Sequence, residues 1–179
     1  MKITSVPIFP LFLCSILTAI YAISCNRISS LSFFIGLFFN RNKVGRCHLF
    51  LSDQSTGIAW GCYGTFPGTQ LTVGSGEANT SLIVAVCKAD TLASFAAKIC
   101  NDLVSGGQTD WFLPSIDELN LMYKNLHTNN QGNFNTSVYW SSSERDYGLA
   151  WRFSLTNVGA GANHYNKSGP AYVRAVRAF

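Results

Sequence analysis

The sequence from residue 53 onward predicts an α+β domain that contains two helices, an antiparallel sheet and long loops. Two stretches repeat apolar residues at the helical period of 3.6 residues, and several later stretches have the composition or alternation of strands. Segments rich in Gly, Ser and Asn separate these elements, as loops commonly do. Because the helices precede most of the strands instead of alternating with them, this order favours α+β over α/β.

The first helix is predicted to follow Asp90, whose side chain can cap it. Its apolar positions share one helical face and are Leu92, Phe95, Ala96, Ile99 and Leu103. Gly106 and Gly107 are expected to end it. An unbroken apolar run at residues 82–87 precedes this helix and fits either a buried strand or a helix.

A capping box predicts the start of the second helix. Ser115 and Glu118 are spaced so that each side chain can bond a free backbone amide of the first turn. The apolar stripe that follows has the helical period and consists of Leu119, Met122, Tyr123 and Leu126. Residues 129–133 are predicted to form a loop after it.

Four strands complete the predicted domain, at residues 58–60, 138–141, 150–155 and 172–179, and only the third alternates cleanly. Residues 156–170 are rich in Gly and Asn and are predicted to be irregular. Tryptophan combines a broad apolar surface with one N–H donor, and the patterns favour core positions for Trp60, Trp111 and Trp151. Trp140 precedes a run of hydroxyl side chains, so a core position and a sugar-stacking role both stay open for it.

The N-terminal residues predict export or a membrane anchor. Residues 3–25 carry no charge and are mostly apolar, and a bilayer needs a span of about 20 residues. A short basic start followed by such a run is also typical of a secretory signal. The expected organisation is a signal peptide or anchor at 1–25, a divergent junction at 26–52 and the domain at 53–179. We therefore expect a cell-envelope or secreted location.

Charge is distributed unevenly along the chain, whose formal net charge is +4. Residues 1–52 hold five basic residues and no acid, so the basic balance belongs to the leader and gives no support to nucleic-acid binding. Residues 147–179 hold four basic residues and again no acid. This stretch can form an anion-binding face, or its charge can be cancelled by strands from the acidic part of the domain.

Residue patterns for catalysis, metal binding or cofactor binding are absent from the sequence. His48, His127 and His164 are scattered, and none has a Cys, Asp or Glu at metal-ligand spacing. Of the domain's three cysteines, Cys62 and Cys87 are the favoured disulfide pair, whereas Cys100 lies on the apolar face of the first helix. We therefore predict a protein without enzymatic activity, metal or cofactor.

Six blocks of the sequence occur together in one known family. They are SDQSTGIAWGC at 52–62, CNDL at 100–103, DWFLPS at 110–115, DELN at 117–120, YWSSSE at 139–144 and YVRAVR at 172–177. In this order they resemble the C-terminal domain of the Lcl collagen-like bacterial adhesins, a bacterial envelope domain of unknown function. Residues 43–51 match the family poorly, which a truncated or frame-shifted start would explain.

The resemblance implies a fold and a function. The family is similar to C-type-lectin-like folds, and its characterised adhesin domain binds sulfated glycosaminoglycans as a trimer. It therefore implies a binding or adhesion module for anionic polysaccharides or cell-surface glycans, with a homo-oligomer as a further expectation. The chain lacks the Glu-Pro-Asn motif of calcium-dependent lectins. The ligand-binding candidates are Arg152, His164, Lys167 and Trp140.

Two alternatives stay open at this point. The first is a structural or degenerate fragment without a ligand. The second is an enzyme related to the formylglycine-generating proteins, which need a reactive cysteine arrangement. In this sequence Cys87 and Cys100 lie in apolar stretches instead, where reactive thiolates are not expected.

Overall fold

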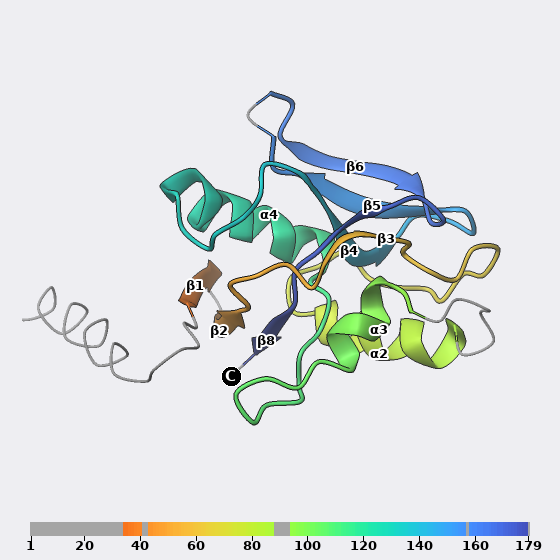
Figure 1. Cartoon of the computed structure of the whole chain (residues 1–179), viewed down its shortest axis with the longest axis horizontal. Helices are drawn as coiled ribbons and strands as arrows, with labels where there is room; N and C mark the ends of the chain where they lie inside the picture. Colours follow the sequence, from red (N-terminus) through yellow and green to blue (C-terminus); the bar gives the residue numbers. More distant parts are fainter. Residues whose placement is uncertain (1–33, 41–42, 88–93, 157, 179) are drawn as a thin grey trace, which may run out of the picture. The chain divides into compact units, whose positions relative to one another are not determined.

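The computed structural model of the chain describes residues 34–40, 43–87, 94–156 and 158–178 (Figure 1). The signal peptide or anchor predicted at 1–25 lies outside these residues. In the described part of the chain no helix is both long and apolar enough to cross a membrane.

The strands within the described residues form two sheets. The first has the order β1-β2-β8, with β1 at Phe34–Asn40, β2 at Lys43–Leu49 and β8 at Val176–Ala178. The second has the order β3-β7-β4-β5-β6. Its strands are β3 (Ser55–Ile58), β4 (Val138–Glu144), β5 (Leu149–Ser154), β6 (Gly161–Asn166) and β7 (Ala171–Val173).

The larger sheet is mixed, which corrects the antiparallel sheet of the sequence analysis. Tyr139 of β4 pairs with Tyr172 of β7 in parallel, whereas the other pairs in this sheet are antiparallel. The reason is that β7 comes after the β5–β6 hairpin and enters the sheet between β3 and β4. The predicted last strand is also divided, since β7 belongs to the larger sheet and β8 to the smaller one.

Among the described residues, three α-helices and one 3-10 helix accompany the sheets, instead of the two helices that were predicted. They are α2 at Gly76–Val86, α3 at Ala96–Asn101, α4 at Ile116–Asn125 and η2 at His127–Asn129. The apolar run at 82–87 forms the end of α2 and not a strand. Figure 1 shows α2 and α3 close together at the lower right and α4 at the left.

The two predicted helices have different outcomes. The capping box is confirmed, because Ser115 accepts the amide of Glu118 and the Glu118 side chain accepts the amide of Ser115. The predicted first helix corresponds to the shorter α3, with Phe95 as its N-cap and Asp102 as its C-cap. Asp90 and Leu92, which were predicted to start it, lie outside the described residues.

Two apolar clusters form the core. One joins α2 and α3 to the larger sheet and includes Trp60, Ile83, Phe95, Cys100, Trp111, Trp140 and Val173. The other packs α4 against β4, β5 and β8 and includes Leu119, Met122, Leu126, Tyr139, Phe153 and Val176. Trp60 and Trp111 are buried as predicted, and Trp151 is half-buried against the second cluster.

Candidate functional site

The turn between β4 and β5 lies at one end of the larger sheet. The Asp146 carboxylate accepts hydrogen bonds from the amides of Gly148 and Leu149, each at 2.8 Å. These bonds hold the pKa of Asp146 below its ordinary value. The Arg145 amide also donates to the carbonyl of Leu149 at 2.9 Å. The turn therefore has a fixed backbone conformation, and Arg145 is exposed on it.

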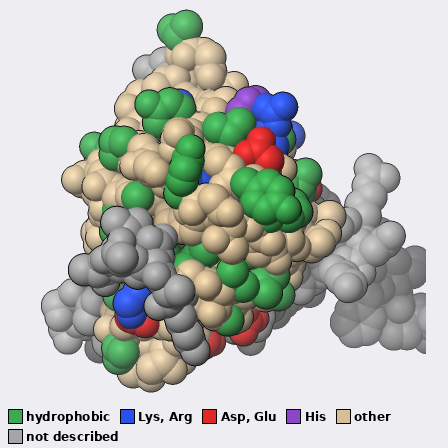
Figure 2. Space-filling model, turned by 90° about the vertical axis from the view of Figure 1, so that its right-hand side faces the viewer, with side chains coloured by type: hydrophobic (Ala, Val, Ile, Leu, Met, Phe, Trp, Pro, Cys, Tyr) green, Lys and Arg blue, Asp and Glu red, His purple; other side chains and the backbone are tan. Residues whose placement is uncertain are grey.

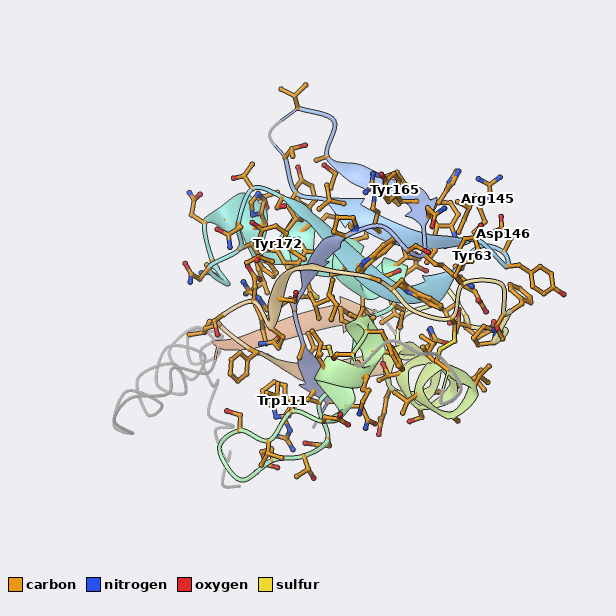
Figure 3. The ribbon with its side chains drawn as sticks, turned by 45° about the vertical axis from the view of Figure 1, so that its right-hand side comes forward. Tyr63, Trp111, Arg145, Asp146, Tyr165 and Tyr172 are labelled. Carbon is orange, nitrogen blue, oxygen red and sulfur yellow. A yellow bond between two sulfur atoms is a disulfide. The ribbon has the colours of Figure 1, made fainter. Side chains whose placement is uncertain are left out.

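Three aromatic side chains are exposed around this turn. Tyr63, Phe66 and Tyr147 are 62%, 47% and 65% exposed. The rings of Phe66 and Tyr147 have their centroids 5.5 Å apart, and the Tyr63 ring lies close to Gly148. Figure 3 shows Tyr63, Arg145 and Asp146 at the same end of the molecule. Exposed apolar groups that gather in this way commonly mark binding surfaces.

His164 adds a second basic side chain beside Arg145. The guanidinium Nη1 of Arg145 contacts the Nε2 atom of His164, and the His164 ring stands edge-on to Trp151. Figure 2 shows a histidine beside Lys or Arg side chains on this face, with an acidic side chain next to them. We call the group Tyr63, Phe66, Arg145, Tyr147 and His164 the turn surface.

The structure does not bring Arg152 to the turn surface. Arg152 pairs with Asn163 across β5 and β6, whereas Trp151 pairs with His164. Because successive side chains of a strand point to opposite faces, Arg152 and His164 lie on opposite faces of the hairpin. Arg152 donates to Asn163 Oδ1 at 2.7 Å, and its guanidinium lies 4.0 Å from the Tyr165 ring centroid. Two of the ligand-binding candidates, Arg152 and His164, therefore lie on different faces of the hairpin.

Lys167 cannot act as a ligand-binding residue, which corrects the prediction. Its side chain is fully buried, and its Nζ atom donates to Glu144 Oε2 and to the Thr65 carbonyl, both at 2.8 Å. It also lies 4.7 Å from the ring centroid of Trp60. The physical reason is that Glu144 is buried too, and a buried carboxylate needs an opposite charge beside it.

Trp140 is likewise part of the core and not of a sugar-binding face. Its exposed fraction is 0%, and its indole N–H donates to the Ile58 carbonyl at 2.8 Å. Every residue of β4 after Val138 is buried, so both faces of the strand are covered there. The tryptophan therefore has no surface with which to contact a glycan.

Lys167 and Glu144 instead support the loop that carries the aromatic side chains. Lys167 bonds the Thr65 carbonyl, and the other carboxylate oxygen of Glu144 accepts the amides of Gly68 and Thr69. The disulfide of Cys62 with Cys87 ties the start of the same loop to the end of α2. This is the cysteine pair that the sequence favoured. The loop is thus fixed at both ends next to the exposed turn.

Cys100, the third cysteine of residues 53–179, is enclosed. Cys100 is free and fully buried, and desolvation raises the pKa of its thiol well above the ordinary value. A thiol of this kind behaves as a small apolar side chain. Among the described residues there is also no group of three or more His, Cys, Asp or Glu side chains that could hold a metal ion.

The geometry thus defines an α+β domain with basic and aromatic groups exposed at one end. Residues 50–177 match the Lcl C-terminal domain family, and because this match covers most of the chain, the chain belongs to that family. No curated protein sequence matches it.

A solved structure has a similar fold. It is the crystal structure of a fimbrial protein from Bacteroides ovatus ATCC 8483, with a TM-score of 0.52 and 17% sequence identity. The similarity covers 78% of this chain and 37% of that protein, so the chain corresponds to little more than a third of the fimbrial protein. At this identity the similarity concerns the fold alone.

Proposed function

We propose that this protein is a non-enzymatic adhesion module of the cell envelope that binds anionic glycans through the turn surface. The observation that carries the proposal is the exposed pair of Arg145 and His164 beside three exposed aromatic rings. Guanidinium groups form strong, charge-assisted hydrogen bonds with sulfate and carboxylate groups. Aromatic faces supply an apolar surface for the C–H faces of sugar rings.

Family membership supports an envelope role, and the fold similarity to a fimbrial protein agrees with it. A C-type-lectin-like fold, membrane attachment through residues 1–25 and assembly into homo-oligomers belong to the same proposal. The buried Cys100 and the disulfide-bonded Cys87 speak against the alternative of an enzyme related to formylglycine-generating proteins, since that chemistry needs an accessible thiolate.

Heparin, a sulfated glycosaminoglycan, tests the proposal directly. We expect the full chain to bind it with an affinity that falls steeply as salt is raised, because exposed charges are screened. Arg145→Ala removes a charge-assisted contact and should weaken binding about tenfold, equivalent to about 1.4 kcal/mol. Tyr147→Ala should weaken binding while leaving its salt dependence unchanged.

Lys124→Ala is the matched control, since it removes one exposed positive charge on α4, away from the turn surface. If Lys124→Ala and Arg145→Ala weaken heparin binding equally, only net charge matters and the assignment of the turn surface is wrong. If the folded chain binds no sulfated or carboxylated polymer, the alternative of a structural fragment without a ligand gains support.

A further inference from the structure

A pocket with a volume of about 560 Å³ lies beside the end of α4 and η2, and its walls carry side chains from this helical end and from the loop that follows. This volume falls in the range of about 300–1,000 Å³ that is typical of small-molecule sites. The pocket shares no residue with the turn surface, and α4 lies on the left of the molecule in Figure 1.

The polar groups of the pocket are amides, hydroxyls and the imidazole of His127. Asn130, Gln131 and Thr136 line it, and their side chains make no hydrogen bond within the described part of the chain. Asn133 uses its Nδ2 atom to reach the Leu51 carbonyl at 3.2 Å, which leaves its oxygen available. No Asp, Glu, Lys or Arg is among the described residues that line the pocket. Its walls therefore offer neutral donors and acceptors together.

Aromatic rings form the other part of the wall. Tyr123 and His127 are stacked with their ring centroids 5.6 Å apart, and Phe134 stands edge-on to His127 at 6.2 Å. Rings beside neutral amides match a ligand that has C–H faces and many hydroxyl groups. A phosphate, sulfate or carboxylate would find no Lys or Arg among the described lining residues to balance its charge, and a purely apolar ligand would leave the amides unsatisfied.

A buried arginine holds the pocket in shape. Arg174 donates to the carbonyls of Gly132 and Asn133 at 2.6 and 2.9 Å, and its guanidinium lies 4.6 Å from the Phe134 ring centroid. Arg174 itself is paired with Asp53 at 2.6 Å. Gly132 has a φ of 81°, and a side chain there would collide with Phe134. A wall fixed in this way loses little conformational entropy when a ligand binds.

We infer that this pocket binds an uncharged pyranose residue, so that the domain has a neutral-saccharide site separate from the anionic-glycan surface. The ring faces of Tyr123 and Phe134 contact the C–H groups of the sugar. Gln131, Asn130 and Thr136 exchange hydrogen bonds with its hydroxyls. Since no charge pairing is involved, binding is nearly independent of salt.

The test is binding of the full chain to an array of oligosaccharides of hexose and N-acetylhexosamine that carry no sulfate or carboxylate. We expect at least one of them to be retained equally at low and high salt. Gln131→Ala and Thr136→Val, which remove one amide and one hydroxyl, should each weaken its binding about tenfold. Gln108→Ala is the matched control, because Gln108 is exposed and does not line the pocket.

The inference is overturned if no neutral oligosaccharide is retained, or if Gln131→Ala and Thr136→Val bind it as the unaltered chain does. It is also overturned if retention is lost at high salt and in Arg145→Ala, because the ligand would then occupy the turn surface. A failure to bind heparin leaves this test unaffected, since the two sites share no residue.

Discussion

Replacing Lys167 by Met tests whether this lysine has a structural role. The substitution removes the positive charge next to Glu144, together with the hydrogen bond to the Thr65 carbonyl and the contact with the Trp60 ring. Both side chains of the pair are fully buried, so Glu144 would be left as an uncompensated charge in the interior. Breaking a buried pair in this way costs about 3–5 kcal/mol. That is a large part of the roughly 5–15 kcal/mol by which a domain is stable.

Urea unfolding followed by tryptophan fluorescence measures this loss. Lys98→Met is the control, since Lys98 forms an exposed pair with Asp102 one helical turn away, and such pairs contribute about 0.5 kcal/mol. A double variant with Glu144→Gln and Lys167→Met should recover part of the stability, because no buried charge remains. If the free energy of unfolding of Lys167→Met lies within about 0.5 kcal/mol of that of the unaltered chain, the lysine is not structural. The reasoning about the burial of the pair is then wrong.

Two further predictions concern buried titratable groups. Burial raises the pKa of Glu118 despite the amides that donate to it, so the folded chain holds this proton more tightly than the unfolded chain does. We therefore compare the free energies of unfolding of the unaltered chain and of Glu118→Gln, measured in urea titrations. The unaltered chain should lose stability relative to Glu118→Gln as pH rises from about 4 to 7. A relative gain in stability with rising pH would contradict this. The Cys100 thiol, which is buried and has a raised pKa, should be alkylated by iodoacetamide only when urea unfolds the chain. Peptide mass spectrometry measures the alkylation of Cys100 separately from that of the other cysteines. Rapid alkylation of Cys100 in the folded chain would favour the enzyme alternative.

A helix or strand can be predicted from the sequence when residues within that element determine where it begins and ends. The capping box at Ser115 and the apolar stripe that follows it act within one helix, and α4 begins where they indicate. β6 was not predicted because its sequence, GANHYN, has no apolar alternation. β6 is stabilised by its pairing with β5 over six residues. The residue pattern of a single segment does not show which other segment it pairs with.

The site was predicted less well than the fold, because the side chains depend on partners from distant parts of the chain. Lys167 was predicted to bind a ligand because it lies in the acid-free stretch at residues 147–179, but its side chain pairs with Glu144, 23 residues away, in the interior. Arg145 was not among the predicted ligand-binding residues. The sequence Asp146-Tyr147-Gly148 between two strand-like segments was a usable signal, because a turn of this composition places its neighbours in solvent.

The position of β7 determines when this domain can fold during synthesis. β7 joins β3 to β4, so without it the larger sheet separates into an isolated strand and a three-stranded β4–β5–β6 meander. Yet β7 lies at Ala171–Val173 and is made after every other strand of that sheet. A chain still being elongated before residue 171 therefore exposes the edges of β3 and β4 together, and such open edges are prone to pair with other chains. Any chaperone that protects this chain has to cover both edges until β7 is inserted.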